Sequence, residues 1–286
     1  MKIRVCITTM TPELAYDAAN HALDRANGPV DLMVVGNCCR FDSMRFRLRD
    51  GDGLAIREFL DNEGVVPAMD ELWRMTRERR YGLSSRARIE DRPDGRDDVL
   101  CYIHDDCRIL EHGWDGRVVS IMSTQPDCDC IGLVGGTGIG ADDIYRSPYQ
   151  MIQLGRHNVH SAMVDAEAHG RRATGPMRIA TADGCALFVR RSFLDQLGGW
   201  SSWWPEPNHG YDNALACMLR RHGRAMWLLP VVFQHPSALK LNLPPEFRNE
   251  IGARRYDERF GGDQKVHADA HRRLYETFRD VLPFHV

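Results

Sequence analysis

The segment VLCYIHDDCR, residues 99–108, joins an apolar run to three polar side chains. Its apolar half, VLCYI, is typical of a buried strand, which would end at His104, Asp105 and Asp106. Neighbouring carboxylates at the end of a buried strand repel each other and lose hydration, and a divalent cation offsets both costs. The segment therefore predicts one of two things: a metal–diphosphate site, or a solvated strand end in which Asp106 caps the residues that follow.

The N-terminal residues have the pattern of a β-α-β unit. Lys2–Thr9 is β-branched and alternating, which predicts a strand. A helix is expected from Thr11-Pro12 to about Asn27-Gly28, because Pro is favoured in the first turn and Gly after the last. Val30–Val35 predicts the second strand. Such a unit indicates parallel strands joined by a right-handed crossover.

In a parallel sheet of this kind, ligands lie beyond the carboxyl ends of the strands. Thr8, Thr9 and Asn37 are expected at that edge of the sheet. No GxGxxG sequence follows the first strand, which disfavours a dinucleotide-binding fold.

Further elements are expected along the chain. They are a loop or short hairpin over Phe41–Gly53, a helix over Pro67–Arg80, an exposed loop over Ser84–Asp98, a helix or turn over Leu110–Ser120, strands over Ile131–Val134, Ala182–Arg191 and Ala225–Phe233, a helix over Asn213–His222, and a helical tail over Pro244–Val286. In the tail, Leu274, Tyr275 and Phe278 form a stripe that favours docking onto the core over binding a partner.

The composition indicates an ordinary globular protein. A chain of 286 residues suits one large α/β domain or two small ones. The formal net charge of −3 gives no global basic field for nucleic acid. The arginine-rich segment Arg74–Arg92 could face a polyanion, but a solvated helix and loop is the favoured interpretation.

Targeting and cysteine patterns predict a cytoplasmic protein. The start, MKIRVCITT, has no apolar signal region, and the longest apolar run, Met226–Phe233, is too short to span a membrane. Nine cysteines in such a chain suggest reduced thiols. The pairs Cys38/Cys39 and Cys128/Cys130 do not have zinc-site spacing, so small buried residues are favoured over a metal cluster.

Two other clusters carry weaker signals. The glycine-rich stretch GGTGIG, residues 135–140, could let the backbone approach a ligand, but it lacks the Lys-Ser/Thr of a nucleotide-binding P-loop. His157, His160 and His169 have no acidic or cysteine partner at metal-ligand spacing and are interpreted as ordinary polar residues.

Four motifs in order carry a resemblance to a known family: YIHDDC, TADGCALFVRRSFLDQLGGW, HGYDNALACMLRRHG and VVFQHP. Together they resemble the GT-A-type glycosyltransferases, close to the large inverting group called family two. The segments VCITT and NEGVVPAMDELW resemble the nucleotide half of that family, and the resemblance covers most of residues 1–240. It implies an α/β fold with a mixed, mostly parallel, Rossmann-like sheet flanked by helices. The implied parts are a nucleotide-sugar half (about 1–134), an acceptor half (about 135–240) and a C-terminal helical extension (241–286).

The resemblance also implies roles for particular residues. These are Asp105, Asp106 and His235 as ligands of Mn²⁺ or Mg²⁺; Thr8, Thr9, Asn37, Asn62 and Asp105 as donor-binding residues; Asp212 as the catalytic base; and Asp183, Gly184, Trp200 and Trp203 on the acceptor side. His104 stands where the first Asp of a strict DxD motif would be, which leaves open which carboxylate binds the metal. Each of His235, Asp212 and the tryptophans has a structural alternative: an ordinary loop histidine, a helix cap and core aromatics.

The role of general base that the resemblance implies for Asp212 is chemically reasonable for a carboxylate. A sugar hydroxyl has a high pKa, so a carboxylate within hydrogen-bond reach must take its proton as the new bond forms. Asp212 begins a predicted helix, and the helix dipole favours its ionised form.

The implied activity is metal-dependent, inverting transfer of a sugar from a nucleotide-sugar to an acceptor hydroxyl. UDP-, GDP- and dTDP-sugars fit equally, the acceptor could be a glycan, protein, lipid or modified nucleic acid base, and the oligomeric state is open. One alternative is a sugar-1-phosphate nucleotidyltransferase, which would need a basic glycine-rich loop that VCITTMTPEL lacks. Another is a non-catalytic nucleotide- or carbohydrate-binding relative.

Overall fold

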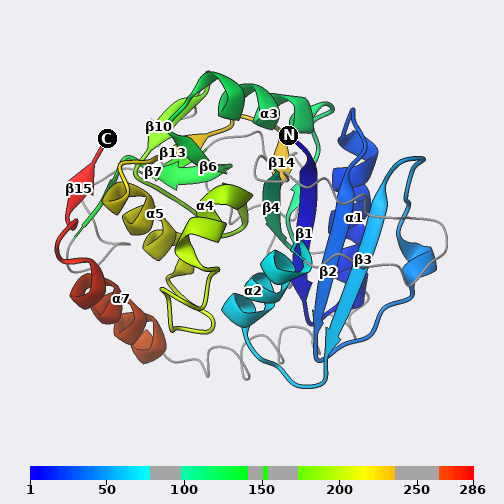
Figure 1. Ribbon diagram of the computed structural model, residues 1–286, viewed down its shortest axis with the longest axis horizontal. Coiled ribbons are helices and arrows are strands. Elements are labelled where there is room, and N and C mark those ends of the chain that lie inside the picture. Colours follow the sequence, from blue (N-terminus) through cyan, green and yellow to red (C-terminus); the bar gives the residue numbers. More distant parts are fainter. Residues whose placement is uncertain (78–97, 141–150, 154–172, 236–263) are drawn as a thin grey trace.

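A computed structural model describes residues 1–77, 98–140, 151–153, 173–235 and 264–286. Its centre is an eight-stranded sheet with the order β10-β13-β6-β12-β4-β1-β2-β3 (Figure 1). Its strands are β1 (Ile3–Thr9), β2 (Asp31–Asn37), β3 (Gly53–Phe59), β4 (Val99–His104), β6 (Cys128–Gly132), β10 (Met177–Ile179), β12 (Ala186–Arg190) and β13 (Ala225–Leu228). In this sheet only β10 and β12 run against the other strands, so the predicted mixed, mostly parallel α/β fold is confirmed.

Three small sheets accompany the central one. The first has the order β11-β7-β9, the second pairs β14 with β5, and the third pairs β15 with β8. Their bounds are β5 (Arg108–Ile109), β7 (Val134–Gly136), β8 (Gly138–Ile139), β9 (Met151–Gln153), β11 (Thr181–Ala182), β14 (Phe233–Gln234) and β15 (Phe284–His285).

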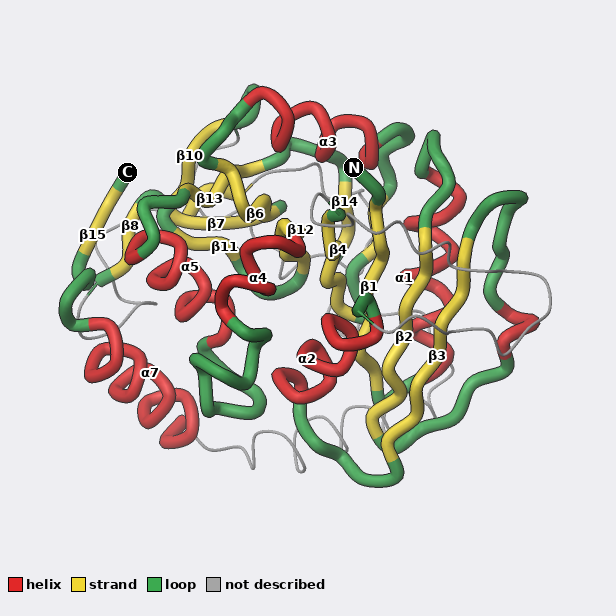
Figure 2. Tube along the Cα trace, viewed as in Figure 1, coloured by secondary structure: helices red, strands yellow, loops and turns green. Residues whose placement is uncertain are grey.

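Helices cover both faces of the central sheet. They are α1 (Pro12–Arg25), α2 (Val65–Met75), α3 (Trp114–Thr124), α4 (Arg191–Leu197), α5 (Tyr211–Arg221) and α7 (Gln264–Phe278), with a 3₁₀ turn, η1 (Ser43–Arg45). Side chains of α1 and α3 share one core, while those of α2, α4, α5 and α7 share the other. Figure 2 shows α2 in front of the sheet and α1 behind it.

Strand β4 shows how the sequence produces this two-sided packing. Leu100 and Tyr102 enter the core under α2 and α5, whereas Val99, Cys101 and Ile103 enter the core under α1 and α3. Successive side chains of a strand point to opposite faces, so an unbroken apolar run is needed where both faces are covered. The predicted central strand is confirmed, and its polar end lies at the edge of the sheet.

The N-terminal unit is confirmed, but one strand beside it was missed. The expected loop over Phe41–Gly53 is followed by β3, which pairs in parallel with β2. β3 is an edge strand that carries Arg57 and Glu58, and charged residues are a common feature of sheet edges. Those charges removed the apolar alternation by which a strand is recognised.

The single strand expected over Ala225–Phe233 is wrong, because the structure has β13, a break and then β14. Leu229 still donates its N–H to the carbonyl of Gly132, but Pro230 has no N–H to continue the ladder. The break releases the chain to pair β14 with β5, which sets the position of His235.

The glycine cluster serves packing rather than an open ligand loop. Gly135 and Gly136 lie in β7, which pairs with β11, and Gly138 lies in β8, which pairs with β15. A Cβ at Gly135 would overlap the carbonyl oxygen of Thr181, so glycine is required for this close approach. The expected loop 84–98 (apart from Asp98), His157, His160, His169 and the tail before residue 264 lie outside the described residues.

The C-terminal helix α7 packs on the core that it shares with α2, α4 and α5. Leu274 and Phe278 are fully buried, and the rings of Phe278 and Trp204 stack with centroids 6.3 Å apart. Tyr275, the third member of the predicted stripe, is 40% exposed. The docking interpretation of this stripe is therefore confirmed for two of its three residues.

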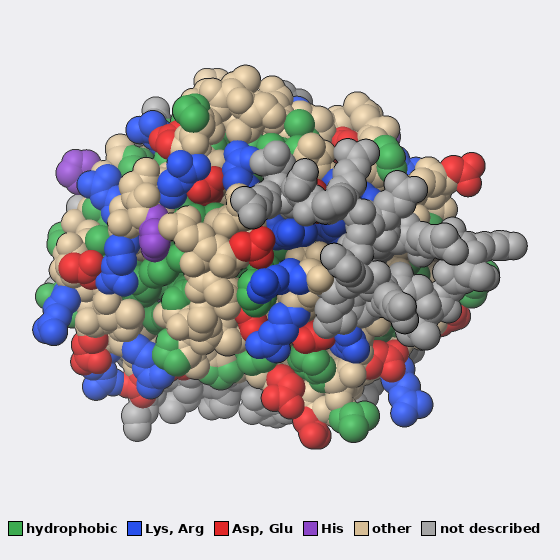
Figure 3. All heavy atoms as spheres, viewed as in Figure 1, with side chains coloured by type: hydrophobic (Ala, Val, Ile, Leu, Met, Phe, Trp, Pro, Cys, Tyr) green, Lys and Arg blue, Asp and Glu red, His purple; other side chains and the backbone are tan. Residues whose placement is uncertain are grey.

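The surface and the thiols agree with the composition. On the face shown in Figure 3, basic and acidic side chains are interspersed. All nine cysteines are free, and seven of them are buried, as small core residues are expected to be. Among the described helices, none has the length and apolar character needed to cross a bilayer.

Candidate active site

The two carboxylates after β4 point to different partners. β1 and β4 pair in parallel with Thr8 opposite His104, which brings Thr9 beside Asp105. The Thr9 hydroxyl donates to Asp105 Oδ2 at 2.5 Å, while Asp106 Oδ1 lies 3.2 Å from His235 Nε2. Both carboxylates are buried. Asp105 is therefore held against β1, and Asp106 faces His235.

His235 reaches Asp106 because β14 pairs with β5, the strand that follows the two carboxylates. Burial lowers the pKa of His235, but the charge of Asp106, its hydrogen bond and the charge of Asp183 outweigh burial and raise the pKa to about 10. The Asp106 carboxylate thus favours the charged form of the His235 imidazole. The structure thus brings together two of the predicted site residues that are far apart in the sequence.

His104 joins this pair. A nitrogen of His104, an oxygen of Asp106 and a nitrogen of His235 all lie within 4.8 Å of one another. The imidazole rings of the two histidines have centroids 5.6 Å apart. Burial lowers the pKa of His104, which favours the neutral ring, the form that can act as a ligand. Two imidazoles and one carboxylate fit a transition ion such as Mn²⁺ better than Mg²⁺, which prefers oxygen ligands.

A second group of possible ligands overlaps the first. Asp183, Cys185 and His235 also offer atoms within 4.8 Å of one another. A hydrogen bond with Cys107 and burial raise the pKa of the Cys185 thiol well above its usual range. Because a thiolate is the form that binds metals, this group fits an ion less well than His104, Asp106 and His235.

Asp212 lies in the first turn of α5, as predicted. Its carboxylate accepts hydrogen bonds from the Gly184 N–H at 3.2 Å, the Asn213 N–H at 2.8 Å and Asn213 Nδ2 at 3.1 Å. Burial and the nearby charge of Asp183 nevertheless raise the pKa of Asp212 to about 7. The helix start does not keep this group fully ionised, and a carboxyl with a pKa near neutrality suits a general base.

Tyr211 connects the two halves of the site. Its hydroxyl shares a hydrogen bond of 2.8 Å with His104 Nε2. Its ring also lies against Gly184, where a Cβ would overlap the ring. Tyr211 therefore fixes the first turn of α5 against the end of β4 and the start of the β12 segment. Neither Tyr211 nor His104 was predicted as a site residue, although both stand next to predicted ones in the motifs HGYDN and YIHDDC.

The predicted donor-side residues lie along the carboxyl ends of β1 and β2. Asn37 Nδ2 donates to Asn62 Oδ1 at 2.7 Å, and Asn37 Oδ1 accepts from the Glu63 N–H at 2.8 Å. These bonds fix the turn that leads into α2. Thr8 is partly exposed and Thr9 is buried against Asp105, so this edge is continuous with the Asp105 end of the site.

The predicted acceptor-side residues divide into two groups. Asp183 and Gly184 lie beside Asp212, as the Gly184–Asp212 hydrogen bond shows. Trp200 is fully buried, with its ring against Tyr102, Trp203 and Tyr211. Trp203 is partly exposed and is the one of the two tryptophans with surface to offer a ligand.

No protein-family model matches this sequence, and no curated protein matches it. Among solved structures, the chain is similar to residues 1–349 of S. aureus TarS, with a TM-score of 0.49 and 10% identity over 98% of this chain and 92% of that one. A second S. aureus TarS structure matches with a TM-score of 0.49 and 11% identity over 93% of this chain and 44% of that one. This chain thus spans less than half of the second structure.

Proposed function

We propose that this protein is a metal-dependent, inverting glycosyltransferase that moves a sugar from a nucleotide-sugar to an acceptor hydroxyl. The proposal rests mainly on the position of the Asp106–His235 pair relative to Asp212. His104, two residues before Asp106, shares a hydrogen bond with Tyr211, the residue before Asp212, so the pair and the carboxylate lie at the same edge of the sheet. Glycosyl transfer of this kind needs a site for a diphosphate leaving group and a base for the acceptor. The two groups of side chains supply these two needs.

His104, Asp106 and His235 would hold the ion, with Mn²⁺ favoured over Mg²⁺ by the two imidazoles. A bound divalent cation stabilises the negative charge that develops on a leaving diphosphate. Asp105, held by Thr9, is left to bind the donor ribose rather than the ion. Asn37 and Asn62 fix the turn that borders the nucleotide side of the site.

Asp212 would act on the acceptor. Its carboxylate takes the proton of the acceptor hydroxyl while the acceptor oxygen forms a bond to the anomeric carbon. The bond from that carbon to the diphosphate oxygen breaks, and its electron pair leaves with the nucleoside diphosphate. Attack opposite the leaving group inverts the configuration of the sugar. Asp183 and Trp203 lie on the acceptor side, where an aromatic face can pack on a sugar ring.

The first experiment identifies the donor. A thermal-shift screen of UDP-, GDP- and dTDP-sugars with and without Mn²⁺ is expected to show one donor that stabilises the protein only with the ion. With that donor, release of nucleoside diphosphate can be followed with water as the acceptor, so the natural acceptor need not be known. Binding of the donor without any release would instead favour a non-catalytic relative.

The decisive variant is Asp212→Asn, which keeps the shape of the side chain but removes its basicity. Transfer is expected to fall by about 10²–10⁴-fold. Donor binding, measured by calorimetry, is expected to stay within about twofold, because Asp212 lies on the acceptor side. Asp280→Asn is the matched control, since Asp280 is an exposed partner of Arg221. If Asp212→Asn released nucleoside diphosphate as fast as the unchanged protein, Asp212 would not be the catalytic base.

A further inference from the structure

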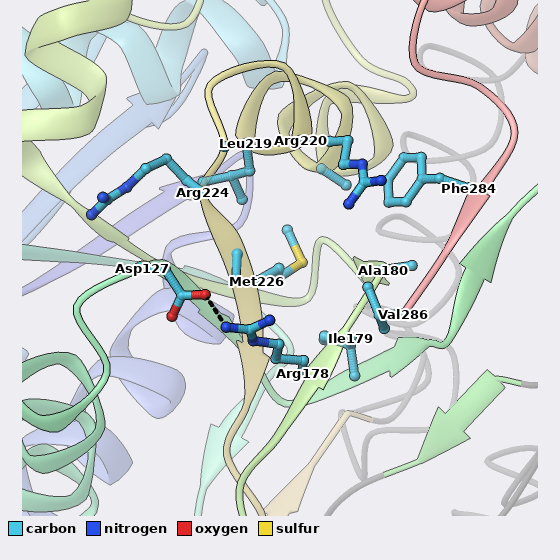
Figure 4. A pocket seen from close by; sticks show the side chains of 13 residues that line it. Asp127, Arg178, Ile179, Ala180, Leu219, Arg220, Arg224, Met226, Phe284 and Val286 are labelled. Carbon is cyan, nitrogen blue, oxygen red and sulfur yellow. Dashed lines mark hydrogen bonds and ion pairs between the residues drawn. The ribbon is translucent and has the colours of Figure 1, made fainter.

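A cavity of about 150 Å³ lies away from the candidate active site, at the β10 end of the central sheet. Residues of β10, β13, the last turn of α5 and β15 line it (Figure 4). Asp212 and Arg220 stand on the same helix, and eight residues of α-helix span roughly 12 Å. The cavity and the proposed base are therefore at opposite ends of α5.

The floor of the cavity is apolar and rigidly packed. Ile179, Leu219 and Met226 are each at most 2% exposed, and the Phe284 ring closes one side at 7% exposed. These residues come from β10, α5, β13 and β15, so they are fixed by the sheet pairings rather than by one mobile loop. Cavities of about this volume accommodate a six-membered ring.

The side chains of the walls carry more positive than negative charge. Three of them are arginines, Arg178, Arg220 and Arg224, and one is a carboxylate side chain, Asp127. Arg178 Nη2 is bound to Asp127 at 2.5 Å, as the dashed line in Figure 4 shows, and Arg224 is bound to Asp129. These two pairs leave Arg220 as the source of the excess charge.

Arg220 is placed to meet a ligand. Its guanidinium carbon lies 5.6 Å from the centroid of the Phe284 ring, and within the described part of the chain it makes no ion pair. Figure 4 shows the Arg220 side chain beside that ring at the border of the cavity. The carbonyls of the last turn of α5 do not oppose an anion strongly, because Leu219 O and Arg220 O accept the N–H groups of Arg224 and Gly223.

We propose that this cavity binds a small organic anion of the monocyclic carboxylate class. The ring rests on Ile179, Leu219 and Met226, and the carboxylate binds the Arg220 guanidinium, which is suited to a two-point contact with it. The site is separate from the transfer site, and its occupation does not depend on glycosyl transfer.

Benzoate is the probe, and benzyl alcohol is its neutral counterpart of similar size. Ligand-observed saturation-transfer NMR with the full chain is expected to show benzoate bound and benzyl alcohol bound at least fivefold more weakly. Raising the salt concentration is expected to weaken benzoate alone, since the difference between the probes is one charge.

Two variants localise the binding. Arg220→Gln is expected to weaken benzoate at least fivefold, and Ala180→Leu is expected to abolish binding by filling the cavity. Arg279→Gln is the matched control, an exposed arginine that does not line the cavity, and it should leave binding unchanged. Equal binding of the two probes, or unchanged benzoate binding in Arg220→Gln, overturns the proposal. Arg220→Gln decides by itself if Ala180→Leu does not fold.

Discussion

Asp105 and Asp106 are neighbours in sequence, yet the structure gives them different surroundings. Asp105 accepts a hydrogen bond from Thr9, whereas Asp106 faces an imidazole from β14. The difference arises because the turn after β4 directs one side chain toward β1 and the other toward the β5–β14 pair. At this scale, the two carboxylates are distinct: one is held by a hydroxyl and the other faces an imidazole.

This division predicts unequal effects on metal binding. Asp106→Ala and His104→Ala are each expected to weaken Mn²⁺ binding by at least about tenfold, because each removes a proposed ligand. Asp105→Ala should change it by less than about threefold. Titration calorimetry with Mn²⁺ measures these values directly, without the transfer reaction. Asp50→Ala, at an exposed position before β3, is the control.

A larger loss of Mn²⁺ affinity in Asp105→Ala than in His104→Ala would contradict this assignment. It would indicate that Asp105 and Asp106 are the metal ligands. Mg²⁺ should bind more weakly than Mn²⁺ to the unchanged protein, because imidazole is a poor ligand for Mg²⁺.

The pKa of Asp212, raised to about 7 by burial and by Asp183, predicts the pH dependence of transfer. The base works only when ionised, so the rate should fall about tenfold per pH unit below pH 7 and level off above pH 8. Measuring transfer from pH 5.5 to 9 tests this. A flat profile across pH 6–8 would contradict the assigned base.

The raised pKa of Asp212 also affects the stability of the fold. Transfer should increase as the pH rises, whereas the free energy of unfolding should decrease. An unfolded Asp has a pKa of about 3.9, so the folded protein holds this proton more tightly. The stabilisation is fully present below pH 4 and is lost as the pH rises through 7. Asp212→Asn, which cannot ionise, is expected to raise the free energy of unfolding by as much as about 4 kcal/mol at pH 8, because each unit of pKa shift corresponds to about 1.36 kcal/mol. Below pH 4, where the group is protonated in both states, the two proteins should unfold alike in urea.

At the scale of elements, the start of α5 and the segment before β12 form the centre of the site. Gly184 donates its N–H to Asp212, and its α-carbon lies against the Tyr211 ring. Thr181 also donates to Asn213 Oδ1 at 2.6 Å. These contacts tie the first turn of the helix to a strand end, which places Asp212 without help from a flexible loop.

Gly184→Ala should disturb this contact, since the added Cβ would overlap the Tyr211 ring. We expect a loss of about 1–3 kcal/mol in the free energy of unfolding. In a Tyr211→Leu background the loss should be smaller, because the ring is gone. A double-mutant cycle measured by urea unfolding gives the coupling, and additive losses would contradict the contact. Gly116→Ala is the control, as its Cβ would meet no neighbour within 4 Å.

At the scale of the whole molecule, the proposed nucleotide and acceptor halves are parts of one sheet. β12, from the second half, lies between β4 and β6 of the first half. The C-terminal α7 adds Leu274 and Phe278 to the core that also holds α2, α4 and α5. Such shared packing predicts cooperative unfolding of the whole chain.

Phe278→Ala tests whether α7 is part of that unit. Phe278 is fully buried against Trp204, so its loss is expected to cost about 3–5 kcal/mol and lower the melting temperature of the whole protein. Tyr275→Ala, on the exposed side of the same helix, should cost less than about 1 kcal/mol. Calorimetry in which only a small separate transition shifts would show that α7 unfolds independently.

The sequence by itself determined the elements with strong local signals. The apolar run before His104 specified a central strand, Pro12 and the alternation around it specified the first β-α-β unit, and the start of α5 specified the place of Asp212. Each follows from the periodicity of side chains along one segment, which needs no knowledge of distant residues. The polar ends of those elements predicted which edge of the sheet would carry the site.

Only the tertiary structure decided which side chains meet there. The break at Pro230 and the β14–β5 pairing bring His235 to Asp106. The register of β1 on β4 places the Thr9 hydroxyl within hydrogen-bond distance of Asp105. The burial of Asp212 beside Asp183 raises its pKa, although the helix start alone favours a low one. Pairing with β2 makes a strand of the charged segment β3, and packing against Tyr102 buries Trp200. Contacts and desolvation depend on packing in three dimensions, which local patterns do not encode.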